Sequence, residues 1–181
     1  KLAIRAYPSK YIENWTMKNG TEAVIRPIRP EDEPLMAKFH ETISERSVML
    51  RYFYPMALSQ RIEHERLSRI SFIDYDREMA LVAEIQGRHG TNEIIAAGRL
   101  IKLYGGTDAE FTVLVSDAYQ GYGLGTEILR RLVEIGKQEG VTRIYGNIVG
   151  ANSNMLRVTE QLGFKAVGQN QEGVVRVELE Q

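Results

Sequence analysis

The chain has 181 residues, of which 43% are hydrophobic and 26% charged, and its formal net charge is −1 at pH 7. This composition is typical of one soluble globular domain with its own core. The near-zero charge argues against a protein held on nucleic acid or on a membrane surface by electrostatics. No apolar run approaches the ~18 residues of a membrane-spanning helix. We therefore expect neither a nucleic-acid nor a membrane partner.

The chain contains no cysteine, which excludes disulfides, thiolate metal ligands and a cysteine nucleophile. The lack of disulfides fits a cytoplasmic protein. The three histidines, His40, His64 and His89, are scattered without the spacing of metal ligands. We expect them on the surface or on helix faces, and we expect no metal site.

Residues 1–20 have weak periodicity and end in the turn signal Asn19-Gly20. We interpret them as a leader or linker with one short strand, joined to a single domain over 21–181. Because the chain begins at Lys1 rather than at a methionine, we expect it to be part of a longer protein. Residues 22–29 predict an edge strand, since Pro27 has no N–H to donate to a central ladder.

Three helices are expected between residues 30 and 70. Acidic residues and proline at 30–34 suit the first turn of the first helix. Ser44 is the expected N-cap of a second helix that runs to about Tyr54, and Ser59 begins a third. The run RIEHER at 61–66 is interpreted as a solvated helix face.

The pattern then changes to short segments rich in β-branched residues, bounded by glycine turns. Strands are predicted at 78–86, 93–103 and 109–116 as an antiparallel meander, then a helix at 123–139, a strand at 142–149, a helix at 152–162, and strands at 164–168 and 174–179. Strands followed by alternating strands and helices indicate an α+β (mixed α/β) fold.

The most informative segment is a strand, a glycine-rich loop and an amphipathic helix in direct succession, VLVSDAYQGYGLGT at 113–126. Three glycines let the backbone approach a ligand, and the helix N-terminus adds free N–H groups and partial positive charge. This arrangement favours a phosphate or pyrophosphate site. Neither the dinucleotide fingerprint nor the P-loop fits the spacing, and a Gln-x-x-Gly-x-Gly pattern remains.

That pattern resembles the acetyl-CoA loop of the GNAT N-acetyltransferase superfamily, and NSNM at 152–155 followed by Gly163-Phe164 resembles its second motif. The resemblance implies a central, mostly antiparallel twisted sheet that is splayed at the acetyl-CoA site and flanked by helices. The segments LAIRAYP, NGTEAVIRPIRPEDEP and SERSVMLRYF look more narrowly like the GNAT module of bifunctional Pat-type protein lysine acetyltransferases. In those proteins the module is fused to an ADP-forming acyl-CoA-synthetase-like region.

The resemblance implies roles for particular residues. Main-chain N–H groups of Leu114 and Val115 are the expected donors to the thioester oxygen, because the family's strand opens there. Asn152 is expected to bond the pantetheine arm or simply to cap its helix, and both roles are compatible. The pyrophosphate would be held by the amides of the loop, Gln120, Gly121, Tyr122, Gly123, Leu124, Gly125 and Thr126. Acetyl-CoA is then the cosubstrate.

Glu110 is the candidate general base, since a carboxylate in an otherwise apolar strand beside the loop is out of pattern. The alternative is an exposed strand-end residue paired with Lys102 or Arg99. Many family members carry a tyrosine as general acid at the position of Thr159, so no general acid is assigned here. With no cysteine available, the acetyl group is expected to pass directly to the amine in a ternary complex.

Three functions remain open from the sequence. The first is acetylation of a lysine in a protein, with an acyl-CoA synthetase as the favoured partner. The second is acetylation of a small amine, and the third is a non-catalytic module that senses acyl-CoA. The run Arg51 to Tyr54 is interpreted either as part of the acceptor side or as core packing.

Overall fold

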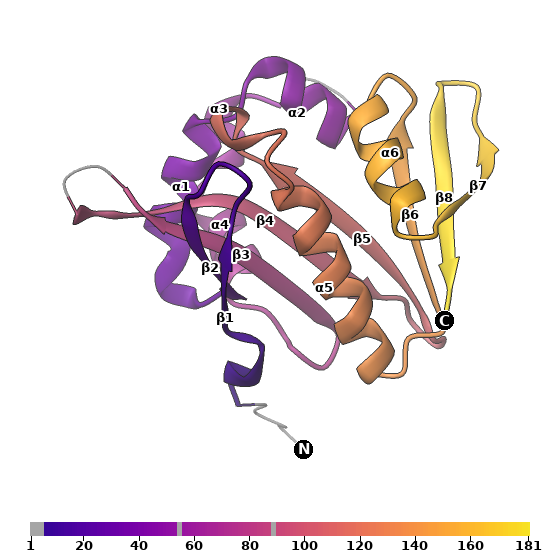
Figure 1. Cartoon of the computed structure of the whole chain (residues 1–181), viewed down its shortest axis with the longest axis horizontal. Helices are drawn as coiled ribbons and strands as arrows, with labels where there is room; N and C mark the ends of the chain where they lie inside the picture. The colour runs from indigo at the N-terminus through magenta and orange to yellow at the C-terminus, as the bar shows by residue number, and fades with distance from the viewer. Residues whose placement is uncertain (1–5, 54–55, 88–89) are drawn as a thin grey trace.

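The computed structural model describes residues 6–53, 56–87 and 90–181. An eight-stranded sheet in the order β1-β2-β3-β4-β5-β6-β8-β7 is flanked by helices (Figure 1). The strands are β1 (Glu13–Thr16), β2 (Glu22–Pro27), β3 (Glu78–Gln86), β4 (Asn92–Lys102), β5 (Asp108–Val115), β6 (Arg143–Val149), β7 (Lys165–Gln169) and β8 (Val174–Glu180). The helices are α1 (Glu33–Glu41), α2 (Glu45–Tyr52), α3 (Leu58–Arg61), α4 (His64–Ser71), α5 (Leu124–Gln138) and α6 (Ser153–Gln161), with 3-10 turns η1 (Ser9–Tyr11), η2 (Pro30–Asp32) and η4 (Asp117–Tyr119).

Every neighbouring pair of strands is antiparallel except β5 and β6, which run parallel. The predicted meander of three strands is confirmed as β3, β4 and β5, and its register shifts once, between Ala83 and Glu84. The α+β class with a mostly antiparallel sheet is therefore correct. No helix in the described part of the chain is both long and apolar enough to cross a membrane.

One face of the sheet is covered by α5, whose apolar stripe follows the predicted i, i+4, i+8 spacing. Ile128 and Leu132 of this stripe are fully buried against the strands. The helix comes so close to β4 that a Cβ placed on Gly98 would lie 2.4 Å from Ile128 Cγ2. Because atoms cannot approach that closely, only glycine fits under α5 at this point.

The opposite face is covered by α1, α2 and α4. Phe39, Val48 and Leu67 come one from each helix and form a second buried cluster with Val82 of β3. The central strands are thus buried on both faces, which explains why β3 is apolar at almost every position rather than at alternate ones. Figure 1 shows α5 on one side of the sheet and α1 on the other.

The prediction that residues 22–29 form an edge strand is wrong. β1, the short strand expected within the first 20 residues, pairs with β2 and so takes the edge. Ile28 N–H donates to Ala80 O on β3, so the missing N–H of Pro27 belongs to the β1 side. β1 begins at Glu13, opposite Ile25, and Pro27 therefore lies beyond its reach.

The third predicted helix is divided into α3 and α4, and the run at 61–66 is not simply a solvated face. Glu63 is extended between the two helices. Arg61 is buried, and its guanidinium donates to Met56 O at 3.1 Å and His40 O at 3.0 Å. A buried arginine needs such acceptors, and Arg61 finds them in main-chain carbonyls of α1 and of the segment before α3. Tyr54 and Pro55, the predicted end of the second helix, lie outside the described residues.

The sheet opens between β5 and β6. Their parallel ladder has three pairs, and the last joins Glu110 to Tyr145. Beyond that pair, residues 111–115 of β5 continue to pair with β4 on one side. In Figure 1 the two ribbons lie close at one end and diverge toward α2 and α6. This is the splayed sheet expected from the resemblance.

Candidate active site

A cavity of about 520 Å³ lies where β5 and β6 separate. Its wall comes from six segments of the chain: the turn between β1 and β2, α2, β5, the glycine-rich loop with the start of α5, β6, and α6. All eleven predicted site residues except Tyr122 line it. The two loops that resemble the acetyl-CoA motifs therefore meet at one cavity, with Glu110 in its wall.

The strand register decides which main-chain groups of β5 face the opening. Ser116 N–H donates to Ile95 O at 2.8 Å and Leu103 N–H to Asp108 O at 2.9 Å, so even-numbered residues of β5 direct their amides to β4. Because successive residues point opposite ways, the N–H groups of Val113 and Val115 face the gap. Val115 can therefore present its N–H to a thioester oxygen in the gap, as expected, but Leu114 cannot, because its N–H lies on the β4 side. Val113 takes the place of Leu114.

The glycine-rich loop presents unpaired amides at the N-terminus of α5. Gly121 and Gly123 have φ values of 85° and 86°, a conformation that glycine adopts without steric cost. Among the residues that the structure describes, none accepts a hydrogen bond from the N–H groups of residues 121–126. These donors, together with the helix dipole, suit an anionic group such as a pyrophosphate. Glu127 N–H, by contrast, bonds Gly123 O at 3.0 Å inside the helix.

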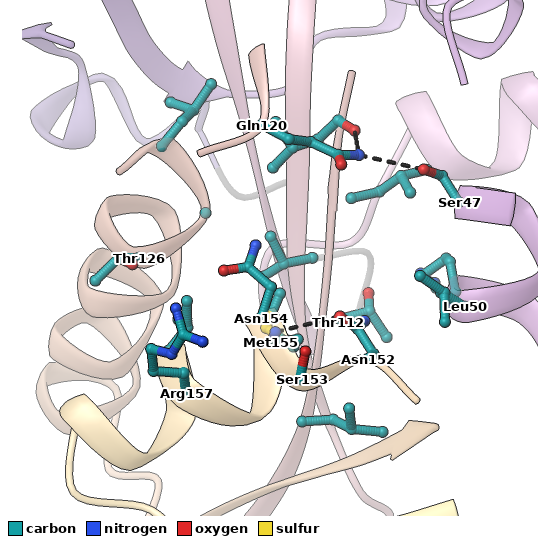
Figure 2. Close-up of a pocket in the computed structure, with 18 of the residues that line it drawn as sticks. Ser47, Leu50, Thr112, Gln120, Thr126, Asn152, Ser153, Asn154, Met155 and Arg157 are labelled. Carbon is teal, nitrogen blue, oxygen red and sulfur yellow. Dashed lines mark hydrogen bonds between the residues drawn. The ribbon is translucent and has the colours of Figure 1, made fainter. Parts of the chain in front are cut away.

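Two contacts tie α2 to this loop. Asp117 Oδ1 accepts from the N–H of Ser44, the N-cap of α2, at 2.9 Å. The side-chain amide of Gln120 donates to Ser47 Oγ at 3.2 Å and to Val115 O at 3.0 Å, and Figure 2 shows it reaching toward Ser47. The side chain of Gln120 thus connects α2 to the open end of β5 by hydrogen bonds.

Asn152 is the N-cap of α6, since its Oδ1 accepts from Met155 N–H at 3.2 Å (Figure 2). Its side chain also lines the cavity, so the two roles expected for it are compatible in this geometry. Thr159 is 1% exposed, and its hydroxyl donates to Leu156 O at 2.8 Å. Thr159 is thus turned into its own helix and does not replace the absent tyrosine.

Glu110 is half-buried and lies beside Tyr145 at the point where the strands part. The alternative that Glu110 pairs with Lys102 or Arg99 does not hold, because Arg99 pairs with Glu78 at 2.6 Å and Lys102 with Glu139 at 3.9 Å. Partial burial and the neighbouring Glu110 carboxylate raise the pKa of Tyr145. Glu110 is thus placed in the cavity without a basic partner in ion-pair contact among the described residues.

Several cavity residues were missed by sequence reasoning. Lys18, Arg46 and Arg157 come from the segment read as a leader, from α2 and from α6, and each lines the cavity. Lys18 is fixed by its N–H, which donates to Tyr122 O at 3.3 Å. Isolated basic residues carry no spacing signal, and only the fold brings them beside the loop. They add positive charge to a cavity suited to anions.

Two of the three histidines lie on the surface or on a helix face, as expected. His64 is exposed and pairs with Glu33, whereas His40 is buried on the inner face of α1. His89 lies outside the described residues. No group of three or more His, Cys, Asp or Glu residues that could hold a metal ion occurs in the described part of the chain.

An open sheet beside a glycine-rich helix N-terminus, with a carboxylate at the branch point, defines an acyl-CoA-dependent acyltransferase site. The sequence model of the acetyltransferase (GNAT) domain matches residues 23–165, so the chain belongs to the GNAT acetyltransferase family.

Three known proteins are informative relatives. The GNAT domain of PAT from S. lividans is 26% identical and superposes with a TM-score of 0.84, covering 97% of this chain and 99% of that one. Acetyltransferase PA5475 of Pseudomonas aeruginosa is 28% identical over 159 residues, which is 87% of this chain and 82% of the relative. Spermidine N-acetyltransferase from Vibrio cholerae, solved with CoA and spermine, shares the fold at 18% identity, with a TM-score of 0.67 and coverage of 88% and 95%.

Proposed function

We propose that the protein transfers an acetyl group from acetyl-CoA to the side-chain amine of a lysine in a protein, with an acyl-CoA synthetase as the favoured acceptor. The observation that carries the reaction type is Glu110 at the branch point of the sheet, in one cavity with the amides of Val113 and Val115. The likeness to the GNAT domain of S. lividans PAT over 97% of this chain supports a protein acceptor.

The residues of the loop fit acetyl-CoA as substrate. The free N–H groups at 121–126 offer donors to the pyrophosphate, and Lys18, Arg46 and Arg157 lie in the same wall. On the open side of β5, the N–H groups of Val113 and Val115 offer donors to the pantetheine arm and thioester, whereas Val115 O already accepts from the Gln120 side chain. When bound, acetyl-CoA supplies an acyl group activated as a thioester.

The acceptor amine is the harder partner to activate. A lysine amine has a pKa of about 10.4, so forming the neutral amine at pH 7 costs roughly 4–5 kcal/mol. Glu110 takes the ammonium proton, directly or through a water, as the amine nitrogen forms its bond to the carbonyl carbon. An N–H of Val113 or Val115 donates to the oxygen as it gains negative charge. The carbon–sulfur bond then breaks, the nitrogen gives up a second proton to water to become the amide N–H, and the thiolate of CoA leaves and takes up a proton from solvent.

Thr159 gives no acid for that last proton, and a thiol with a pKa near 8.5 is a tolerable leaving group without one. The chain has no cysteine to carry the acetyl group, so amine and thioester meet in one ternary complex. We further propose that the domain belongs to a longer, cytoplasmic protein that also carries an acyl-CoA-synthetase-like region. Within residues 1–20, β1 and Met17 are part of the domain itself and not of a linker, because β1 pairs with β2 and Met17 is buried in the core.

The deciding experiment offers labelled acetyl-CoA to the protein with three acceptors: a purified acyl-CoA synthetase, the same synthetase with its acetylated lysine replaced by arginine, and spermidine. We expect label on the first alone. Label on spermidine and not on the synthetase would favour a small-amine acetyltransferase. Tight binding of acetyl-CoA without transfer to any acceptor would favour a sensing module.

A further inference from the structure

A second cavity, of about 300 Å³, lies on the face of the sheet covered by α1, α2 and α4. No residue of the glycine-rich loop lines it. It shares Arg51, Thr112 and Leu114 with the larger cavity, so the two spaces meet at the middle of β5. Glu110 lies two residues before Thr112 and on the same face of the strand. The second cavity therefore begins beside the proposed base.

The charges of this second cavity are strongly unbalanced. Four arginines line it, Arg51 from α2, Arg66 and Arg69 from α4, and Arg99 from β4, against one acidic residue, Glu78. A space with this charge attracts an anion. Arg66 and Arg69 are one turn apart on α4, and packing brings them together with Arg51 and Arg99 from two other elements.

Two of these arginines already have partners. Arg99 pairs with Glu78 at 2.6 Å and also donates to Ile70 O. Arg66 donates to Arg61 O at 3.1 Å and to the Tyr52 hydroxyl at 3.2 Å. Both guanidinium groups are thereby fixed in position at the wall of the cavity.

Arg51 and Arg69 are different. Within the described ranges, neither donates a hydrogen bond to any residue nor forms an ion pair. Arg51 is half-buried and lies over the ring of Tyr52, 4.7 Å from its centroid. Burial lowers the pKa of Arg51, with Arg99 and Arg66 adding to that effect. A half-buried guanidinium with five donors and no protein acceptor is free to pair with an anionic ligand.

His40 gives a second and independent observation. It lines the same cavity, is 2% exposed, and neither ring nitrogen has a hydrogen-bond partner among the described residues. Burial and four arginines, Arg66, Arg61, Arg51 and Arg99, lower the pKa of His40 to about 3. The ring is therefore neutral at pH 7, with one N–H to donate and one nitrogen to accept. An unsatisfied buried ring costs stability and is expected where a ligand completes it.

We infer that this arginine-lined cavity binds a carboxylate or phosphate group carried by the acceptor, while the acceptor's amine lies at Glu110. Arg51, at the junction of both cavities, would form the main ion pair with this anion. Arg69 would add a second positive charge at the exposed side of the cavity, and the buried His40 ring would donate a hydrogen bond from the inner side. For a lysine acceptor in a protein, the anion would be a side chain near the lysine in the folded or extended acceptor segment. This inference rests on the proposed transfer to an amine and adds the charge of the acceptor.

Acetyl-CoA does not explain these features. Its own phosphates have the free amides at 121–126, which lie in the other cavity together with Lys18 and Arg157. The second cavity also lies on the face of β5 opposite to α5. The anion that binds in the second cavity is therefore inferred to belong to the acceptor and not to acetyl-CoA.

The test compares matched acceptors. The first pair is a lysine peptide with one glutamate and the same peptide with glutamine in its place. The glutamate is placed in turn at each position one or two residues from the lysine. The other pair is a small amino acid and its amide. We expect kcat/KM to be about 10- to 100-fold higher for the acidic member of at least one pair, as a charge-assisted ion pair allows.

Two variants assign any preference to the cavity. Arg51→Gln should reduce the acidic-to-neutral ratio to near one. Arg69→Gln, at an exposed position where folding is not at risk, should reduce it in part. Arg130→Gln is the matched control, because Arg130 lies on α5 in a surface ion pair with Glu127, away from both cavities. That variant should keep the ratio of the unmodified protein.

Binding without transfer separates this inference from the proposed function. Inorganic phosphate should bind the protein in calorimetry, shift the His40 ring signals in NMR, and compete with the acidic acceptor. Arg51→Gln should abolish all three effects. If neither acceptor pair shows a preference of threefold, or if Arg51→Gln keeps it, the inference is overturned, even when the neutral lysine peptide is acetylated well. If only the small pair is acetylated, with an Arg51-dependent preference, the inference stands and the protein-lysine proposal fails.

Discussion

Glu110 and Tyr145 face each other as the last pair of the parallel ladder between β5 and β6. One step further along β5 the sheet is open, and the N–H groups of Val113 and Val115 have no strand to pair with on that side. The proposed base is thus held rigidly by the last closed pair of the ladder, next to the place where the acyl group would enter.

Replacing this base tests the mechanism directly. Glu110→Gln keeps the size of the side chain but removes the proton acceptor, so kcat should fall by about 10²- to 10⁴-fold. The dissociation constant for acetyl-CoA, measured by calorimetry, should change little because the free amides are intact. Glu22→Gln, at the exposed first residue of β2, is the matched control and should keep full turnover. Full turnover in Glu110→Gln would remove Glu110 from the mechanism.

The loop amides can be tested with a pair of glycines. Gly121 and Gly105 both have positive φ, 85° and 71°, and a Cβ on either would meet nothing within 4 Å. Alanine at either position should cost about 1 kcal/mol of folding free energy, measured by urea unfolding. Only Gly121→Ala should weaken acetyl-CoA binding, on the order of tenfold, because its methyl group would stand where the pyrophosphate approaches. Equal binding by both variants would argue against a pyrophosphate at the loop.

The buried imidazole predicts a pH dependence of stability. The folded-state pKa of His40 is about 3, below the ordinary value of 6.5, so between these values the unfolded chain binds a proton that the folded chain does not. The free energy of unfolding should therefore fall as the pH drops below 6.5, by about 2 kcal/mol at pH 5. His40→Phe should remove most of that slope. Urea unfolding at pH 7.5 and 5.0, in buffers without phosphate, measures it, and identical slopes would contradict the prediction.

The hydrogen bonds of Asp117, which join α2 to the loop before α5, predict a second pH dependence of stability, this time from a carboxyl group. Partial burial raises the pKa of Asp117, but hydrogen bonds, led by those from Ser44, outweigh it and the pKa is lowered. A lowered carboxyl pKa stabilises the fold above the unfolded value of 3.8, and this is lost as pH falls through the folded value.

Asp117→Ala should thus cost about 1 kcal/mol at pH 7, and the difference from the unmodified protein should shrink below pH 4. Asp117→Asn, which keeps an acceptor without charge, should fall between the two in chemical unfolding at pH 7. A difference that stays constant down to pH 2.5 would show that the charge of Asp117 plays no part.

Much of the local structure follows from short-range signals. Ser44 and Asn152 cap their helices, α5 follows its apolar spacing, and the glycine turns bound the meander as predicted. These features depend on neighbours within a few residues, so the sequence specifies them. The glycine-rich loop could be read as an anion site for the same reason.

The sequence by itself determined the α+β class, the order of the elements and the glycine-rich loop suited to an anion. It also singled out Glu110 as a carboxylate in an otherwise apolar strand. Only the tertiary structure decided that β1 takes the edge from β2, that Val113 rather than Leu114 presents its amide, and that Arg61 turns inward. It also gathered Arg51, Arg69 and Arg99 around His40. Strand order, register and the meeting of distant side chains are set by non-local packing, which leaves no periodicity or spacing in the chain.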